Sequence, residues 1–185
     1  MEISRAAIES VAENTVDGFL SPLFYAVLGG PAAMWIFKAV STCDSMIGRR
    51  DARYVRFGTV GARSDDALNF LPARLSVWLF ALAALCAGGS WRGCLRTAGR
   101  DGARHASPNA GIPEAAMAGA LQVRLGGAVE YDGEAVAHGP FGGEYREPQP
   151  EDVTRAVRML WGVSLWGGGL TVAGLLALAF YLEKS

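Results

Sequence analysis

Three carboxylate side chains recur at four-residue spacing near the start of the chain, at Glu9, Glu13 and Asp17. On an α-helix each one is turned by about 40° from the one before, so all three project from one face, with Asn14 beside them. Carboxylates on one face repel each other unless they are neutralised, and these lead directly into an apolar segment. A divalent cation with bound phosphate would supply the missing positive charge. The alternative is an acidic helix face in contact with water.

Two further groups combine acids with neutral polar side chains. Asp44 follows Thr42 by two positions, and the pair Asp65 and Asp66 is followed about one helical turn later by Asn69. Carboxylate and amide oxygens suit magnesium and the phosphate that it binds. Acids in turns also cap helices or remain hydrated, so this pattern alone leaves both interpretations open.

Arginines and a glycine-containing turn provide groups that bind anions. Arg50 and Arg53 lie between the two acidic groups, and their planar guanidinium groups match carboxylate or phosphate, although arginines also anchor chains at membrane surfaces. A polar turn at 107–114 leads into an expected helix at 113–121. Free backbone N–H groups at such a helix start can hold an anion, or they are simply capped.

Composition limits the class of protein. The chain has 185 residues, of which 51% are hydrophobic and 19% charged, with 17 basic against 18 acidic side chains. This balance gives no indication of nucleic-acid binding, the apolar content excludes disorder, and the length suits a single domain over 1–185. Three cysteines without a C-x-x-C pair and two histidines provide no ligand set for structural zinc. P-loop, nucleophile-elbow and zinc-helix motifs are also missing from the sequence, which argues against conventional NTPases and hydrolases.

Long uncharged segments indicate a membrane protein. Residues 159–182 form 24 positions without a charge, about 36 Å of helix against a bilayer core of about 30 Å. Residues 75–91 form a second segment, and 19–37 a third, in which prolines and paired glycines predict two short helices or a re-entrant hairpin. The polar connection at 92–158 includes a predicted β-hairpin near 129–136. The predicted fold is mostly α: a polytopic helical membrane protein with one small hairpin.

Four ordered motifs are together more specific than any one of them. They are ESVAENTVDG at 9–18, TCDSM at 42–46, RSDDALNFLPAR at 63–74 and SPNAGIPEAAMAGAL at 107–121. With these motifs the chain resembles the CobD/CbiB family of adenosylcobinamide-phosphate synthases. The resemblance covers essentially the whole chain.

The resemblance implies a multi-pass enzyme of the bacterial inner membrane that works in cobalamin biosynthesis. It implies ligation of the amino group of (R)-1-aminopropan-2-ol O-phosphate to the free propionate carboxyl of adenosylcobyric acid, with consumption of ATP. A carboxylate is a poor acyl donor, so ATP must activate it, and Mg²⁺ would screen the converging phosphates. The expected partners are the lipid bilayer, the corrinoid and the amino-alcohol phosphate, without nucleic acid.

On the basis of this resemblance, roles are assigned to residues of the motifs and of the segment between them. The expected catalytic residues are Glu13, Asp17, Asp65 and Asp66. The expected metal ligands are Glu9, Glu13, Asp17 and Asp66. The expected substrate-binding residues are Asn14, Thr42, Asp44, Arg50, Arg53, Asn69, Arg74, Ser107, Asn109 and Glu114.

Members of the family usually carry a further apolar region before the ESVAEN motif, whereas here Met1 lies eight residues ahead of Glu9. We therefore expect that the chain is a fragment, that its start lies further upstream, or that a separate N-terminal chain or a homo-oligomer completes it. Two other functions stay open. One is a magnesium-dependent membrane transferase of a phosphorylated lipid, although no D-D-x-x-D repeat is present, and the other is a non-catalytic membrane subunit of a split synthase.

Overall fold

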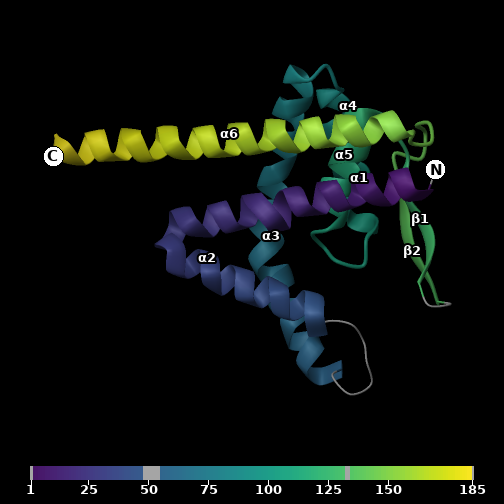
Figure 1. Cartoon of the computed structure of the whole chain (residues 1–185), viewed down its shortest axis with the longest axis horizontal. Helices are drawn as coiled ribbons and strands as arrows, with labels where there is room; N and C mark the ends of the chain where they lie inside the picture. The colour runs from purple at the N-terminus through teal and green to yellow at the C-terminus, as the bar shows by residue number, and fades with distance from the viewer. Residues whose placement is uncertain (1, 48–54, 132–133, 185) are drawn as a thin grey trace.

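Six α-helices and one β-hairpin make up the part of the chain that the computed structural model describes, residues 2–47, 55–131 and 134–184. The helices are α1 (Glu2–Asn14), α2 (Ser21–Ile47), α3 (Val55–Cys86), α4 (Trp91–Asp101), α5 (Gly111–Leu121) and α6 (Pro150–Glu183). A π-helical turn, η1 (Thr15–Leu20), joins α1 to α2, and a 3-10 turn, η2 (Gly102–Arg104), follows α4. The outer parts of α2 and α6 extend toward one side, away from α4, α5 and the hairpin (Figure 1).

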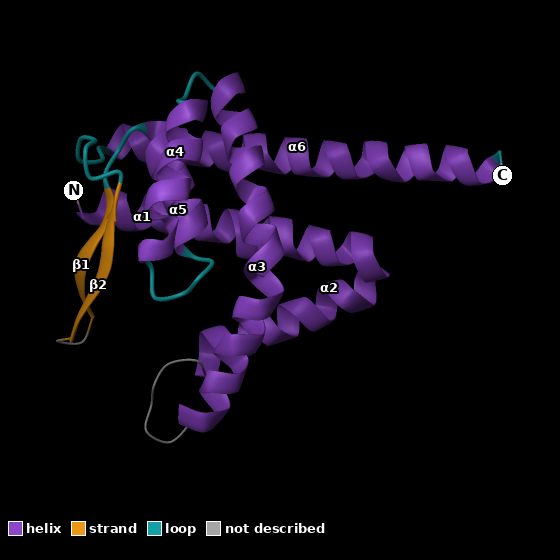
Figure 2. Ribbon diagram, turned by 180° about the vertical axis from the view of Figure 1, so that it is seen from behind, coloured by secondary structure: helices purple, strands orange, loops and turns teal. Residues whose placement is uncertain are grey.

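The hairpin consists of strands β1 (Leu125–Tyr131) and β2 (Glu134–Phe141), which pair antiparallel with an irregularity between Leu125 and Gly127. The predicted mostly helical chain with one small hairpin is therefore confirmed. The hairpin is longer than the predicted 129–136, and its Asp132–Gly133 turn lies outside the described residues. Figure 2 shows the two strands at the end of the molecule that also holds the N-terminus.

Small residues allow α1, α3 and α4 to pack closely around α5, and we call these helices with the hairpin the globular part. This helix is buried along nearly its whole length, with α4, α3 and α1 against it. A Cβ atom on Gly119 would collide with the carbonyl oxygen of Gly93, so α4 and α5 touch through their backbones. The surrounding core includes Ile8, Phe80, Met117, Leu125, Phe141 and Met159. Helix α5 begins at Gly111, two residues before the predicted start, because the backbone N–H of Ile112 already donates to the Asn109 carbonyl (3.1 Å).

Helix α2 bends back on itself in the interrupted apolar segment at 19–37. Gly30 has φ +68°, a conformation that L side chains rarely adopt, and the following Pro31 has no N–H to continue a helical ladder. The arms on either side of the bend form a helical hairpin (Figure 1), across which Tyr25 and Phe37 stack with ring centroids 5.2 Å apart. A hairpin is one of the two predicted forms, and that it re-enters a membrane stays a prediction. Its first arm is not short, because it continues α1 and η1 without a break.

Helix α3 differs from the predicted apolar segment at 75–91. It begins earlier, covers Val55–Cys86, and ends before a turn at 87–90. The uncharged stretch continues through the turn, so the absence of charge does not mark where the helix ends. The hydroxyl of Ser90 accepts a hydrogen bond from the backbone N–H of Gly93 and starts α4 there.

A proline inside α3 creates a link to α2. Pro72 has no N–H, so the carbonyl of Leu68, four residues earlier, loses its helical donor. The hydroxyl of Tyr25 donates to that carbonyl at 2.9 Å. The same tyrosine therefore contacts both the second arm of α2 and the middle of α3.

Helix α6 starts in a well-defined way and ends without neighbours among the described residues. Gln149 and Asp152 form a capping box at its first turn, and the Asp152 carboxylate also accepts from Arg146 and Arg155. The helix packs on α1 and α3 as far as Gly167, and beyond this point its side chains are mostly exposed. The exposed residues are predominantly apolar, as in the predicted segment at 159–182.

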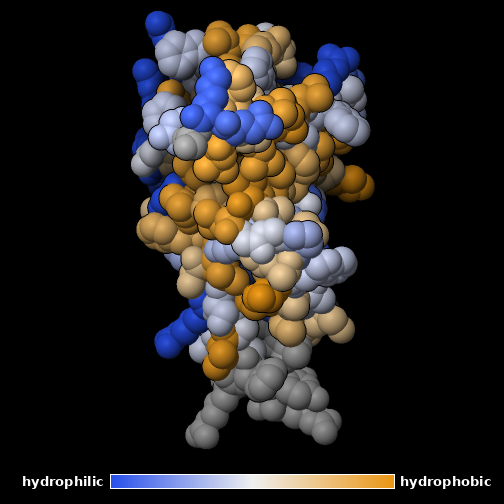
Figure 3. Space-filling model, turned by 90° about the vertical axis from the view of Figure 1, so that its left-hand side faces the viewer, coloured by the Kyte–Doolittle hydropathy of each residue, from blue (hydrophilic) through white to orange (hydrophobic). Residues whose placement is uncertain are grey.

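Three helical stretches are long and apolar enough to cross a membrane: Glu2–Met46, which includes the bend, Gly58–Cys86 and Pro150–Glu183. Figure 3 shows that hydrophobic side chains gather on the face toward which the outer ends of α2 and α6 extend. Exposed residues in these stretches include Trp35, Trp78, Leu170 and Phe180. A lipid-facing surface has this composition, because hydrocarbon solvates apolar side chains and leaves backbone groups to be satisfied within helices.

Candidate functional site

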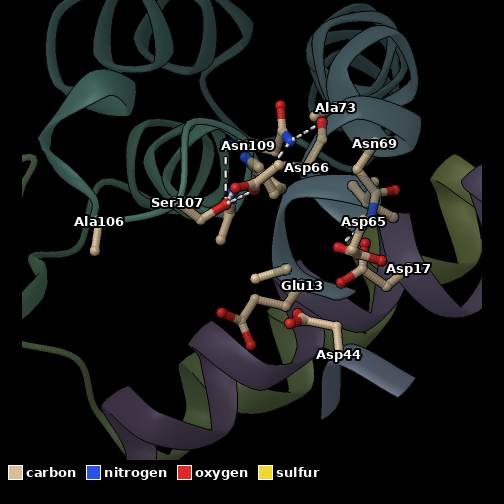
Figure 4. Close-up of a pocket in the computed structure, with 14 residues that line it drawn as sticks. Glu13, Asp17, Asp44, Asp65, Asp66, Asn69, Ala73, Ala106, Ser107 and Asn109 are labelled. Carbon is tan, nitrogen blue, oxygen red and sulfur yellow. Dashed lines mark hydrogen bonds between the residues drawn. The ribbon is translucent and has the colours of Figure 1, made fainter. Parts of the chain in front are cut away.

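A cavity of about 390 Å³ opens where α1, η1, α2, α3 and the segment before α5 meet. Its polar lining consists of five carboxylates, two amides and one hydroxyl: Glu13, Asp17, Asp44, Asp65, Asp66, Asn69, Asn109 and Ser107. Figure 4 shows side chains from separate helices directed into the same space. The four residues predicted to be catalytic thus come together in one cavity, which we call the acid cavity, and their role there stays a prediction.

The first helix contributes Glu13 from its last turn, and Asp17 follows from η1. Glu9 does not line the cavity. It lies about 12 Å from Asp17 along a helical axis, at 1.5 Å per residue, and its carboxylate accepts a hydrogen bond from the backbone N–H of Gly126 at 2.7 Å. Asn14 is exposed and donates to the carbonyl of Ser10, so it too lies outside the cavity lining.

The second arm of α2 contributes Asp44, which the bend brings back beside the end of α1. Thr42 is exposed and does not line the cavity. Residues two positions apart on a helix project in directions that differ by about 200°, which accounts for the difference between Thr42 and Asp44. The predicted substrate-binding residues Arg50 and Arg53 lie outside the described residues.

Helix α3 holds Asp65 in a chain of polar contacts. The Ser21 hydroxyl donates to the Asn69 amide oxygen at 2.6 Å, and the Asn69 amide nitrogen donates to Asp65 Oδ2 at 3.0 Å. This fixes the orientation of the Asn69 amide, since its oxygen and nitrogen have different partners. The other carboxylate oxygen, Asp65 Oδ1, is buried and has no hydrogen-bond partner among the described residues.

The turn that precedes α5 is hydrogen-bonded to Asp66. The Ser107 hydroxyl donates to Asp66 Oδ1 at 2.8 Å, and the Asn109 side-chain amide donates to the Asp66 carbonyl at 2.7 Å. Arg74 donates to the Asn109 side-chain oxygen at 3.1 Å. Arg74 therefore supports the wall of the cavity and is not among the residues that line it. Sequence spacing could not pair Asp66 with a turn about forty residues later.

Glu114 also lies outside the lining of the acid cavity. It forms a second cluster with Glu13 and His105, in which one potential ligand atom of each residue lies within 4.8 Å of the others. His105 was not predicted from the sequence, because a single histidine in a polar connection has no characteristic spacing to the acids that it meets in the fold. Glu13 belongs to both groups, so the second cluster adjoins the acid cavity.

The acid cavity has the chemistry of a cation site. The residues described as lining it include five acids and no lysine, arginine or histidine. Closely spaced carboxylates repel one another and are stabilised by a cation or by protons. An all-oxygen donor set is what Mg²⁺ prefers, and the buried, unpartnered Asp65 Oδ1 is an available acceptor. These residues therefore fit the metal ion that the family resemblance implies.

Comparison with known sequences gives a consistent result along most of the chain. A sequence model described as CobD/Cbib protein matches residues 1–160. The chain is 44% identical over 181 residues to the cobalamin biosynthesis protein CobD of Klebsiella pneumoniae, which is 98% of this chain and 54% of that protein. It is 45% identical over 173 residues to the cobalamin biosynthesis protein CbiB of Salmonella arizonae, 93% of this chain and 54% of that one.

A third relative, the cobalamin biosynthesis protein CobD of Geobacter metallireducens, is 48% identical over 164 residues, 87% of this chain and 51% of that protein. The chain thus spans about half the length of the curated relatives that it matches. No solved structure matches it.

Proposed function

Because the chain belongs to the CobD/CbiB family, we propose that it acts in cobalamin biosynthesis as all or part of an adenosylcobinamide-phosphate synthase. The reaction joins the amine of (R)-1-aminopropan-2-ol O-phosphate to a propionate carboxyl of adenosylcobyric acid and consumes ATP. The observation that carries the proposal is the convergence of all the acids predicted to be catalytic, Glu13, Asp17, Asp65 and Asp66, on one cavity.

In this proposal the acids hold magnesium and the phosphates that come with it. Glu13, Asp17, Asp65 and Asp66 would be the ligands, with Asp65 Oδ1 available as an acceptor. The bound ion would neutralise charge on the nucleotide and on the activated carboxyl group. Asn69 and Ser107 donate hydrogen bonds to the carboxylates of Asp65 and Asp66 and keep them in fixed orientations, which lowers the cost of organising the site.

The size of the acid cavity suggests which substrates fit inside it and which stay outside. A space of about 390 Å³ is at the small end for a ligand site, where pockets for drug-sized molecules reach about 1,000 Å³. It suits the amino-alcohol phosphate and a cation. The corrin ring would stay outside with one propionate arm extended toward the acids.

The apolar helices support a site at a membrane. We propose that the stretches Glu2–Met46, Gly58–Cys86 and Pro150–Glu183 lie in a bacterial inner membrane. Asp17, Asp44 and Asp65 come from the first two of these stretches. Ionisable side chains in such positions are costly unless they face a protein interior or a polar cavity, so their gathering around one cavity is consistent with a functional site.

Growth of a bacterial strain that lacks its own synthase tests the proposal. The chain is expressed alone and together with the remaining part of a full-length relative, and cells are supplied with cobyric acid. Rescue in either format supports the proposal. Asp66→Asn should abolish rescue at equal membrane abundance, because loss of one metal-binding charge costs roughly a thousandfold in rate.

Glu183→Gln, an exposed acid near the end of α6, is the matched control and should rescue as the unmodified chain does. If both formats are abundant in the membrane and growth returns only on cobinamide, the catalytic assignment fails. The non-catalytic subunit then replaces it, since a chain that covers about half of its relatives could bind a partner without performing the reaction.

A further inference from the structure

The second cluster joins three separate parts of the fold. Glu13 comes from the end of α1, His105 from the segment after η2, and Glu114 from the first turn of α5. The Glu114 side chain is nearly inaccessible, and its residue is 4% exposed. One carboxylate oxygen of Glu114 lies within 4.8 Å of one of Glu13. Two ionised carboxylates at this separation repel each other, and a proton or a cation between them removes the repulsion.

The orientation of His105 shows which ring atom faces the carboxylates. Its Nδ1 accepts a hydrogen bond from the backbone N–H of Ser107 at 2.9 Å. The Nε2 atom lies 4.0 Å from Glu114 Oε1. Because Nδ1 is an acceptor, the neutral ring carries its proton on Nε2 and presents a donor to the carboxylates. His105 is thus placed to orient a carboxylate, as residues around metal ligands commonly do.

Little positive charge compensates Glu114 in the protein itself. Among the described residues, the ion-pair partner of Glu114 is His105. The arginines Arg5 and Arg124 form their ion pairs with Glu147 instead. The buried Glu114, with a second acid beside it and a histidine as its ion-pair partner, is costly to ionise, and a divalent cation removes that cost by neutralising the negative charges.

We propose that Glu13 and Glu114 hold a second divalent cation of the hard, oxygen-preferring kind, Mg²⁺ or Mn²⁺, with His105 Nε2–H hydrogen-bonded to a ligating carboxylate. Glu13 also lines the acid cavity, so its carboxylate bridges this ion and the one in the cavity. Paired cations that share a carboxylate lie about 3.5–4 Å apart in enzymes that transfer phosphoryl groups. The inference rests on the proposed function for what the two ions do, whereas their binding is independent of it.

Binding of Mn²⁺ to the purified full chain in detergent, without substrates, tests the proposal. The free-ion signal in electron paramagnetic resonance counts the bound ions. We expect about two per chain for the unmodified protein and about one for Glu114→Gln, which keeps the side-chain shape but removes a ligand charge. Asp65→Asn should leave the ion at Glu114 in place. His105→Gln should weaken that ion by about 10- to 100-fold, the usual effect of losing a group that orients a ligand.

Glu183→Gln is the matched control for the number of glutamates and should bind as the unmodified chain does. Equal binding by Glu114→Gln and the unmodified chain overturns the proposal, since the two acids then share a proton and no cation. A second measurement needs no substitution. Two Mn²⁺ ions bridged by Glu13 are spin-coupled at saturation, and a spectrum of isolated ions only would overturn the shared site.

The growth experiment and the binding experiment separate the two proposals. Two bound ions in a chain that fails to rescue growth contradict the ligase assignment and leave the second site intact. Rescue of growth by a chain that binds a single ion, unaffected by Glu114→Gln, contradicts the second site and leaves the ligase assignment intact.

Discussion

The hydroxyl of Ser107 donates a hydrogen bond to the carboxylate of Asp66 at 2.8 Å, across 41 positions of the chain. This bond fastens the turn before α5 to the middle of α3 and sets the direction of one cavity acid. Ser107 can therefore affect the proposed reaction through the orientation of Asp66.

We predict that Ser107→Ala lowers the rate of phosphorylated amide formation roughly 10- to 100-fold, because a hydrogen bond to a charged group contributes about 1.5–3 kcal/mol. Membranes that contain the variant are assayed with ATP, magnesium, adenosylcobyric acid and aminopropanol phosphate. Ser45→Ala is the control, since that exposed hydroxyl donates only to a carbonyl of its own helix. An unchanged rate for Ser107→Ala would show that Asp66 is oriented without it.

Asp65→Asn should raise the magnesium concentration that the reaction needs. The substitution removes one charge from the acid cavity and replaces the unpartnered Oδ1 or its neighbour with an amide. At limiting magnesium we expect a rate loss on the order of a thousandfold, partly recovered at high magnesium. The measurement is the rate as a function of magnesium concentration. A loss of equal size at every concentration would assign Asp65 a role other than metal binding.

Gly119→Ala should destabilise the contact between α4 and α5. Its new Cβ would meet the Gly93 carbonyl, and packed backbones cannot move apart without cost, so we expect a loss of about 1–3 kcal/mol. Thermal unfolding in detergent, followed by circular dichroism, measures the change. Gly99→Ala, on the exposed side of α4 with open space around it, should instead be neutral or gain up to about 1 kcal/mol. Equal melting temperatures for the two variants would contradict the close contact.

The globular part should lose stability in acid through Asp101. This buried carboxylate accepts hydrogen bonds from Arg100 and from the backbone N–H of Gly142. The bonds from Arg100, first of all, lower the pKa of Asp101 below its ordinary value. A lowered pKa stabilises the fold at pH values above the unfolded value, about 3.9. That contribution is lost as the pH falls through the folded value.

The melting temperature of the unmodified chain should therefore fall between about pH 5 and about pH 2, and Asp101→Asn should flatten this part of the curve while lowering the melting temperature at neutral pH. Thermal scans across the pH range provide the measurement, with Glu183→Gln as an acid-to-amide control. A steep acid transition that survives in Asp101→Asn would locate the titrating group elsewhere.

Alkaline carbonate washing should leave the chain in the membrane pellet. The outer part of α6 exposes apolar residues over several turns, from Leu165 to Leu182, and transfer of such a surface to water is unfavourable. An arginine at Leu170 would cost about 2.5–3.5 kcal/mol in the middle of a spanning helix and should lower the inserted fraction. Quantitative release of the unmodified chain by carbonate would contradict membrane insertion.

The helices and the hairpin were predictable because they depend on local signals. The uncharged stretch of α6 and the Asp-Gly pair between short β-forming runs are examples, and both elements are present. The end of α3 was placed too late, because charge does not change where the helix stops. The residues at which helices begin and end depend on caps such as Ser90, and a cap forms only when the backbone brings its side chain to a free N–H group.

The site was predictable in part for the same reason. Glu13 and Asp17 share a helix face, so their spacing indicates that they act together. Asp44 joins them only because the bend at Gly30 reverses the chain, whereas Glu9 lies about two turns before Asp17 and accepts a hydrogen bond from Gly126. Such contacts between distant segments leave no periodic pattern in the sequence, so spacing alone could not separate Glu9 from the acids that line the cavity.

Because α2 bends at Gly30, the angle between its two arms affects the distance between acids far from the bend. About 14 residues of helix separate the bend from Asp44, a length of about 20 Å, and the other arm runs a similar distance to Asp17. A rotation of about 10° at the bend would thus move the two carboxylates by about 3–4 Å relative to each other, more than the distance of about 2.0–2.1 Å between Mg²⁺ and a ligand oxygen. Tyr25 stacks on Phe37 across the two arms and donates a hydrogen bond to Leu68. Both contacts lie nearer to the bend than Asp17 and Asp44 do, so a small shift there corresponds to a larger shift at the two acids. A change in the angle of the bend at Gly30 would therefore change the distance between Asp17 and Asp44 at the far ends of the two arms.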